Sequence, residues 1–350
     1  MTPDEQAPGR DKGLILRIQR MSTEDGPGIR STIFFKGCPL RCVWCHNPES
    51  ISARPQVHWV GTRCIGCMSC IEVCPNKALT RTASGITVNR RVCTGCLSCA
   101  GVCPSTAMEV YGEYYDAQDL VREVLKDRVF FEKSGGGVSL SGGEPTLQSG
   151  FANEVLGALK EQGIHTALDT CGQCPWERLE ELLAHTDLLL YDLKLMDEDL
   201  HRHYTGQGLD RILENLARAG RYCRADSRRI EIWIRTPVIP LHTDLEENIR
   251  AVGSFIRDTM NGAVARWELC AFNNLCIHKY EGLGVNWKCK EYSLMTDQDM
   301  ERLAQVARTA LGRGGIVHTS GPTRSAGETR IRPVHGRPPE GPCLEVKEEG

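Results

Sequence analysis

Cys38, Cys42 and Cys45 are the residues of this sequence with the most specific chemical spacing. They form a C-x3-C-x2-C motif within eight residues, directly after the apolar segment STIFFKG at 31–37. A [4Fe–4S] cluster usually takes four thiolate ligands, so three cysteines leave one iron without a protein ligand. That iron could bind the amino and carboxylate groups of a substrate directly. The alternative is a structural zinc site, which needs a fourth ligand that His46, beside Cys45, is poorly placed to supply.

Eight further cysteines form two runs with the spacing of bacterial ferredoxins. The pattern C-x2-C-x2-C-x3-C-P begins at Cys64 and is repeated 29 residues later from Cys93. In this pattern the fourth cysteine of each run binds the other cluster. We therefore predict two more [4Fe–4S] clusters, one held by Cys64, Cys67, Cys70 and Cys103 and the other by Cys74, Cys93, Cys96 and Cys99. A pair of zinc ribbons is the alternative interpretation.

The composition argues against several classes of protein. The 350 residues include 18 cysteines, yet the N-terminal segment MTPDEQAPGRDKG has no apolar run that could act as an export signal. Closely spaced thiols in an intracellular protein indicate metal ligands rather than disulfides, so we expect a cytoplasmic, low-oxygen setting. A net charge of −3 gives no general attraction to nucleic acid or to an anionic membrane. No apolar stretch approaches the ~20 residues that cross a bilayer.

Strand and helix patterns alternate along most of the chain, and their order predicts how distant residues are brought together. The alternation favours an α/β fold with a parallel sheet, either open or closed into a partial barrel. In barrels of this kind the chemistry lies at the carboxyl ends of the strands. Strands are predicted from Leu14 and at 31–37, 137–140, 165–168, 188–191, 230–235, 267–270 and 315–319. Helices are predicted at 117–131, 151–162, 175–185, 209–218, 244–257 and 297–311.

Four parts of the chain differ in composition. Residues 13–53 and 113–320 are expected to form the α/β domain. A small inserted domain at 54–112, which holds the eight cysteines of the two runs, is expected to interrupt it. Residues 1–12 are polar, and residues 321–350 are rich in proline, glycine and charge, so a disordered leader and a disordered tail are expected.

Two motifs together resemble the radical S-adenosylmethionine (SAM) superfamily. C-x3-C-x2-C follows one predicted strand, and SGGEP at 141–145 follows another. In that superfamily the fold is a partial parallel (β/α) barrel, and the open iron binds the methionine end of SAM. One electron then releases methionine and a 5′-deoxyadenosyl radical. The resemblance implies that Trp44 packs against the adenine, whereas an ordinary core or surface tryptophan would have no such role.

Four further segments resemble the activating enzymes of glycyl radical enzymes, over roughly residues 13–320. They are STEDGPGIR at 22–30, DTCG at 169–172, DLK at 192–194 and IWIRTPVIP at 232–240. The resemblance implies an oxidoreductase whose radical takes a hydrogen atom from a glycine Cα of a partner glycyl radical enzyme. The simple activator of pyruvate formate-lyase lacks the eight-cysteine insert, so the expected partner is a lyase, dehydratase or decarboxylase. A flavodoxin or ferredoxin would supply the electrons.

The resemblance also implies roles for residues at the strand ends. Asp25 would help to position the target glycine loop and, with Lys194, is expected to be catalytic. The residues expected to bind SAM are Trp44, Gly142, Gly143, Glu144, Asp169, Thr170, Asp192, Lys194, Arg235 and Asn273. Among these, Asp169, Thr170 and Asp192 match positions that hold a monovalent cation in a relative. Asn273 stands where many relatives carry a histidine, and it can form hydrogen bonds but cannot titrate.

Several interpretations stay open at this point. The clusters of the insert could relay electrons to the cluster of Cys38, Cys42 and Cys45, or they could only stabilise the insert. The radical could act on another peptide residue or on a small molecule, although the DGPG segment would then be unexplained. A ferredoxin-type electron carrier would account for the insert but for neither the three-cysteine motif nor the barrel.

Overall fold

A nine-stranded sheet organises the part of the chain that the computed structural model describes, which is 12–225, 230–312 and 314–325. The strand order is β13-β12-β11-β10-β9-β8-β2-β1-β7. All neighbouring pairs between β2 and β13 are parallel, whereas β1 is antiparallel to β2 and β7. The strands are β1 (Lys12–Ser22), β2 (Arg30–Phe35), β7 (Glu113–Asp116), β8 (Gly137–Gly142), β9 (His165–Thr170), β10 (Leu188–Asp192), β11 (Glu231–Val238), β12 (Val264–Ala271) and β13 (Val317–Ser320). The prediction of an α/β fold with a mostly parallel sheet is therefore confirmed.

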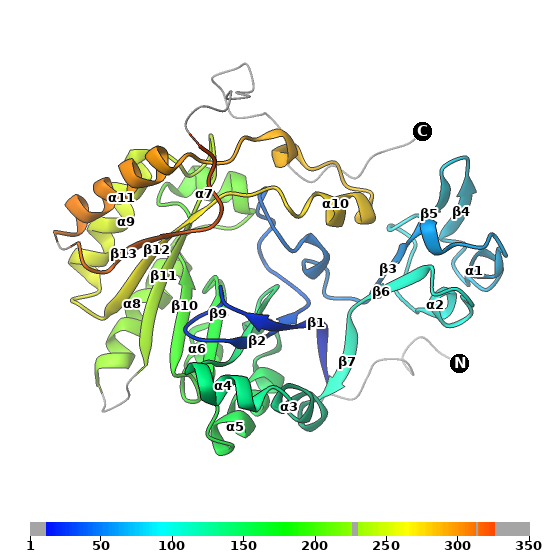
Figure 1. The fold of residues 1–350 in the computed structure, drawn as a ribbon, viewed down its shortest axis with the longest axis horizontal. Helices are drawn as coiled ribbons and strands as arrows, with labels where there is room; N and C mark the ends of the chain where they lie inside the picture. The colour runs from blue at the N-terminus through cyan, green and yellow to red at the C-terminus, as the bar shows by residue number, and fades with distance from the viewer. Residues whose placement is uncertain (1–11, 226–229, 313, 326–350) are drawn as a thin grey trace.

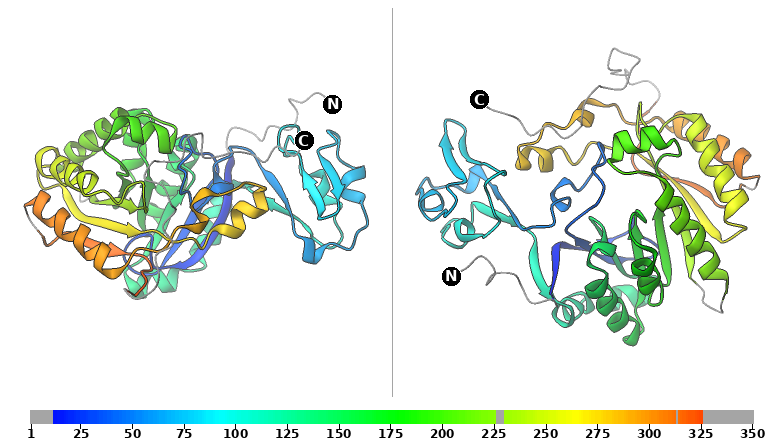
Figure 2. Two further views of the ribbon diagram at one scale, coloured as in Figure 1. Left: turned by 90° about the horizontal axis from the view of Figure 1, so that it is seen from above. Right: turned by 180° about the vertical axis from the view of Figure 1, so that it is seen from behind.

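Helices connect the strands, and most of them cover the outer face of the sheet, which curves into an open arc (Figure 1). They are α3 (Ala117–Leu125), α4 (Arg128–Ser134), α5 (Ser149–Glu161), α6 (Trp176–Leu183), α7 (Glu198–Thr205), α8 (Asp210–Ala225), α9 (Glu246–Thr259), α10 (Ile277–Leu283) and α11 (Asp297–Leu311). Figure 2 shows the same arc from above and from behind. No helix within the described ranges is both long enough and apolar enough to span a lipid bilayer.

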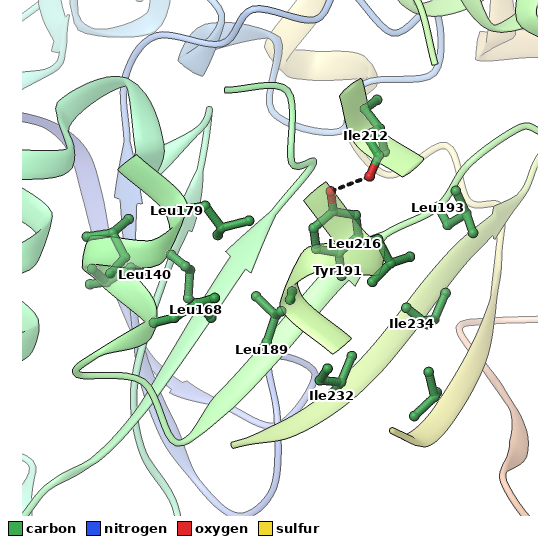
Figure 3. Close-up of a cluster of buried hydrophobic side chains, with 14 of the residues drawn as sticks. Leu140, Leu168, Leu179, Leu189, Tyr191, Leu193, Ile212, Leu216, Ile232 and Ile234 are labelled. Atoms are coloured by element: carbon green, nitrogen blue, oxygen red, sulfur yellow. Dashed lines mark hydrogen bonds between the residues drawn. The ribbon is translucent and has the colours of Figure 1, made fainter. Parts of the chain in front are cut away.

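The main core lies between the sheet and these outer helices (Figure 3). Leu140, Leu168, Leu189 and Ile232 lie side by side in register on neighbouring strands, and all four are fully buried. Side chains of a strand alternate between its two faces, so the residues next to this row point to the inner face of the arc. This alternation directs Asp169 and Asp192 inward while their neighbours fill the core.

The helices differ from the sequence prediction in two ways. The helix expected at 117–131 is divided into α3 and α4 at Asp127, whose buried carboxylate accepts hydrogen bonds from Ser31 Oγ at 2.6 Å and Arg20 Nη1 at 2.5 Å. Helices α7 and α10 were not predicted. Both are short, with eight and seven residues, so neither presents enough turns for an apolar periodicity to stand out.

Residues 56–111 form a small body of their own, which projects from one side of the arc (Figure 1). Strands β3 (Gln56–Trp59) and β6 (Met108–Tyr111) pair at its base, and β4 (Leu79–Thr82) pairs with β5 (Gly85–Val88). Two single-turn helices, α1 (Ser69–Glu72) and α2 (Ser98–Gly101), carry Cys70 and Cys99 into a separate apolar core. We call this body the insert.

The ordered main domain extends beyond its predicted bounds at both ends of the chain, into residues that were expected to be disordered. Lys12, assigned to the leader, begins β1 opposite Asp116. Residues 321–325, assigned to the tail, include Arg324, which donates hydrogen bonds to the carbonyls of Met295 at 3.0 Å and Leu294 at 2.9 Å. Residues 1–11 and 326–350 lie outside the described part of the chain.

Candidate active site

The three-cysteine loop borders a cavity of about 270 Å³ at the carboxyl ends of the parallel strands. Cys38, Cys42 and Cys45 all line this cavity. The loop follows β2, and its backbone is hydrogen-bonded to the end of α7. Arg41 N donates to Thr205 O at 2.7 Å, and Val43 N donates to Tyr204 O at 3.0 Å. The thiols therefore face the cavity from one rigid wall.

These thiols form a donor set suited to iron. Burial raises the pKa of Cys38 well above that of an ordinary thiol, and the nearby Cys42 raises it further. Burial also raises the pKa of Cys45 to about 12. Thiols bind iron as thiolates, and binding of the metal releases their protons. Within the described residues, no three His, Cys, Asp or Glu side chains lie close enough together to hold a single metal ion. A [4Fe–4S] cluster, whose irons are spread over a cube, fits three thiols around a cavity.

The two glycines of the SGGEP segment bring backbone to the cavity wall beside the start of the cysteine loop. Gly142 has a φ of +108°, and a Cβ there would lie 2.4 Å from Phe35 N, so only glycine fits between β8 and β2. Gly143 N donates to Phe35 O at 2.9 Å, and a Cβ at Gly143 would lie 2.2 Å from Gly37 O. Both glycines line the cavity, which leaves it room for a ligand.

Glu144 is engaged within the protein rather than facing the cavity, which differs from the expected direct contact with SAM. Its carboxylate is fully buried and accepts hydrogen bonds from Thr170 Oγ1 at 2.7 Å and Cys171 N at 2.8 Å. It also accepts two hydrogen bonds from Thr146. Glu144 thus joins the ends of β8 and β9, so its effect on the cavity is to fix the backbone around Gly143.

Asp192 and Lys194 form an ion pair in the cavity wall. Their side chains are 26% and 13% exposed, and Asp192 Oδ2 lies 2.5 Å from Lys194 Nζ. Burial alone would lower the pKa of Lys194, but the carboxylate of Asp192 raises it above the ordinary value. Lys194 is therefore cationic, and this wall can bind a ligand that carries both an amino and a carboxylate group.

Asp169 and Arg235 lie on β9 and β11, the strands on either side of β10, and both line the cavity. Burial raises the pKa of Asp169 to about 7, although Arg235 Nη1 lies 3.7 Å away and Ser141 Oγ donates to the carboxylate at 2.6 Å. The charge of Asp192 acts in the same direction as burial. The expected cation ligands are thus already engaged: Asp169 with Ser141, Asp192 with Lys194, and Thr170 with Glu144.

Of the remaining predicted site residues, Trp44 lines the cavity, whereas Asn273 and Asp25 do not. Trp44 lines the cavity but is only 5% exposed, and it packs beside Tyr204 in a second apolar core. Asn273 is not among the lining residues, and its Oδ1 accepts a hydrogen bond from Leu275 N at 3.2 Å. Asp25 also lies outside the lining set, and its carboxylate accepts hydrogen bonds from Ser22 Oγ at 2.5 Å and Thr32 Oγ1 at 2.7 Å.

The lining also includes residues that were not proposed from the sequence, among them His46, Cys171, Cys270 and Phe272. Each lies next to a predicted element or motif: His46 follows Cys45, Cys171 follows Thr170, and Cys270 and Phe272 lie at the end of β12. Burial lowers the pKa of His46, so its ring is neutral in the cavity wall. These residues could have been found from the sequence by considering every residue at or just after the carboxyl end of a predicted parallel strand.

The cysteines of the insert surround two small pockets. One is lined by Cys64, Cys67, Cys70 and Cys103, and the other by Cys74, Cys93, Cys96 and Cys99. These are the two sets that the ferredoxin spacing predicts, with the fourth cysteine of each run exchanged. The donor sets, four thiols each, fit [4Fe–4S] clusters.

Comparison with known proteins places these features in a family. The model of the radical SAM superfamily matches residues 32–251. The trans-4-hydroxy-L-proline dehydratase activating enzyme of Clostridioides difficile is 41% identical over 299 residues, which covers 84% of this chain and 95% of that protein. The (2S)-3-sulfopropanediol dehydratase activating enzyme of Klebsiella oxytoca is 37% identical, over 86% of this chain and 95% of that protein. The isethionate sulfite-lyase activating enzyme of Oleidesulfovibrio alaskensis is 39% identical, over 77% and 86% respectively.

Proposed function

This chain belongs to the radical SAM superfamily and, within it, to the activating enzymes of glycyl radical enzymes. We propose that the cavity described above is the site where SAM is bound and cleaved. The observation that carries the proposal is the single cavity shared by the three-cysteine loop, the Gly142–Gly143 backbone and the Asp192–Lys194 pair. A [4Fe–4S] cluster on Cys38, Cys42 and Cys45 would supply one electron, and SAM would be split into methionine and a 5′-deoxyadenosyl radical.

The residues around the cavity bind and orient SAM. The glycine backbone leaves space for the methionine end, and Asp192 and Lys194 offer partners for its amino and carboxylate groups. Arg235 contacts the ribose and Trp44 the adenine in this proposal, and the presence of both in the cavity wall supports it. The carbon radical then takes a hydrogen atom from a glycine Cα of the partner, which yields 5′-deoxyadenosine and a glycyl radical. This step requires orientation and exclusion of water rather than a general base.

The partner in this proposal is a glycyl radical enzyme of the dehydratase, lyase or decarboxylase kind. The three relatives described above are named for activating two dehydratases and a sulfite-lyase. We further propose that the insert holds two more [4Fe–4S] clusters and passes electrons from a ferredoxin or flavodoxin in a low-oxygen cytoplasm. The two pockets with four cysteines each support this number of clusters.

Electron paramagnetic resonance tests the proposal directly. The iron-loaded protein is mixed anaerobically with SAM, dithionite and a candidate partner encoded by a neighbouring gene. We expect a doublet signal on the partner that disappears when its loop glycine is replaced by alanine. Formation of 5′-deoxyadenosine without a doublet would leave the radical chemistry in place and identify the wrong target. If neither product forms, an electron-transfer role becomes the better explanation.

A further inference from the structure

Helix α10 contacts both the three-cysteine loop and the insert, and Figure 1 shows it between these two parts. On the side of the loop, Tyr280 Oη donates to Cys45 O at 2.7 Å and Lys279 Nζ donates to His46 O at 2.8 Å. Trp287, just beyond the helix, donates from Nε1 to Val43 O at 2.9 Å and stacks on Tyr280. Three carbonyl groups of the cluster-binding loop, those of Val43, Cys45 and His46, are therefore held by side chains of one segment.

The carboxyl end of α10 is held by side chains of the insert. The last carbonyls of a helix have no partner within the helix. Here Gly282 O accepts a hydrogen bond from His58 Nδ1 at 2.9 Å, and Leu283 O accepts one from Arg90 Nε at 3.3 Å. A Cβ at Gly282 would lie 2.9 Å from the His58 ring, so glycine permits this close approach. His58 belongs to β3, and Arg90 lies three residues before Cys93.

The two cysteine runs of the insert repeat each other in sequence but differ in their surroundings. A Cβ at Gly95, between Cys93 and Cys96, would lie 2.3 Å from the carbonyl oxygen of Pro55, where the chain enters the insert. Gly66 takes the same place in the first run and has no heavy atom within 4 Å of such a Cβ. The second run therefore packs toward the main domain, and the first run faces outward.

Resting on the relay proposed above, we propose that the two sites of the insert act in a fixed order and that α10 is the crossing point. Electrons enter at the outer site of Cys64, Cys67, Cys70 and Cys103. They pass to the inner site of Cys74, Cys93, Cys96 and Cys99, and cross beside α10 to the three-cysteine loop. Each transfer moves one electron, so the external ferredoxin or flavodoxin is oxidised once for every SAM that is cleaved. His58 and Arg90 are positioning residues, because they hold the inner site against α10 and touch no reacting atom.

The test compares two reductants on the same variants. Arg90→Met combined with His58→Phe removes all three hydrogen bonds to α10, including the one from Arg90 Nη2 to Gly282 O at 3.4 Å, while keeping the bulk of the side chains. Freeze-quenched electron paramagnetic resonance follows reduction of the cluster that responds to SAM. We expect reduction by a reduced ferredoxin to slow at least tenfold, whereas reduction by dithionite, which is small enough to enter the cavity, keeps its rate. Arg90→Lys with His58 intact should restore much of the ferredoxin-driven rate.

Two controls make the outcome decisive. Arg81→Met changes an exposed arginine of β4 and should behave as the unmodified protein, with iron and sulfide contents equal in all samples. Hydrogen exchange of the metal-free double variant should be faster in residues 277–283, which reports the loss of the contact itself. An unchanged ferredoxin-driven rate would overturn the crossing at α10, and so would equal slowing with both reductants. A failure of the unmodified protein to cleave SAM with dithionite would instead contradict the proposed function.

Discussion

Side-chain hydrogen bonds hold carbonyls of the cluster-binding loop, and Tyr280 makes one of the shortest. Its hydroxyl is buried and donates to Cys45 O at 2.7 Å. Tyr280→Phe leaves that carbonyl with only the weak thiol donor Cys276 Sγ at 3.9 Å, and a poorly satisfied buried group costs about 1–3 kcal/mol. We expect this loss in chemical unfolding together with an altered resonance signal of the SAM-binding cluster.

Tyr191→Phe is the matched control for Tyr280. The Tyr191 hydroxyl is equally buried and donates to Ile212 O at 2.7 Å, but it does so in the main core, behind the sheet (Figure 3). The control should lose a similar amount of unfolding free energy and keep the cluster signal unchanged. Identical cluster signals in both variants would show that the Tyr280 hydrogen bond has no influence on the cluster.

The raised pKa of Asp169 makes the free energy of unfolding depend on pH, with a definite sign. Burial raises its pKa from 3.8 to about 7, so the folded chain holds this proton more tightly than the unfolded chain. The resulting stabilisation is complete below pH 3.8 and is lost as the pH rises to about 7. Asp169→Asn removes this contribution. In urea unfolding of the metal-free protein, the advantage of the unmodified chain over the variant should shrink from pH 4 to 7, and parallel curves would contradict it.

At the scale of elements, the junction of β8 and β2 depends on Gly142. Any side chain there meets the backbone of Phe35 and must also adopt a φ of +108°, which L residues rarely accept. We expect Gly142→Ala to lower the free energy of unfolding by more than about 2 kcal/mol, because backbone strain and overpacking each cost about 1–3 kcal/mol. The variant should also bind SAM weakly, as measured by the change that SAM causes in the cluster spectrum.

Gly150 provides the control for this substitution. It lies in the first turn of α5, and a Cβ there would have no heavy atom within 4 Å. Gly150→Ala should therefore leave SAM binding unchanged and stabilise the chain by up to about 1 kcal/mol, because alanine favours the helix. Equal effects of the two substitutions would mean that the close approach at Gly142 has no energetic weight.

Local patterns sufficed to predict the elements whose apolar periodicity is long, but not the contacts that depend on the tertiary fold. The helix expected at 297–311 is α11, and the strand ends carrying Asp169, Asp192 and Arg235 do meet at one cavity. Glu144 was expected to face SAM, but its carboxylate is bound by Thr170 and Cys171. A sequence motif cannot reveal such partners, because they come from another part of the chain. Helix α10 was missed for the same kind of reason, since its stability comes from packing rather than from its own seven residues.

At the scale of the whole molecule, the three groups of cysteines should be separable by the reductant. Cys67→Ala together with Cys96→Ala removes one ligand from each site of the insert and leaves the three-cysteine loop intact. We expect SAM cleavage to persist with dithionite and to fall at least tenfold with reduced ferredoxin. Production of 5′-deoxyadenosine measures both rates, and full turnover with ferredoxin would show that the insert clusters only stabilise their domain.

The base of the insert has a consequence for how such a protein could arise. The chain enters through β3 and leaves through β6, and these two strands are paired from Gln56 opposite Tyr111 to Trp59 opposite Met108. The entry and exit points are therefore neighbours in space, so the sheet of the main domain closes whether or not the insert is present. A gene for a plain barrel could gain or lose this module in a single recombination event without rerouting any strand. The carboxyl end of α10 and the Lys36 side chain would lose their hydrogen-bond partners in the insert and exchange them for water.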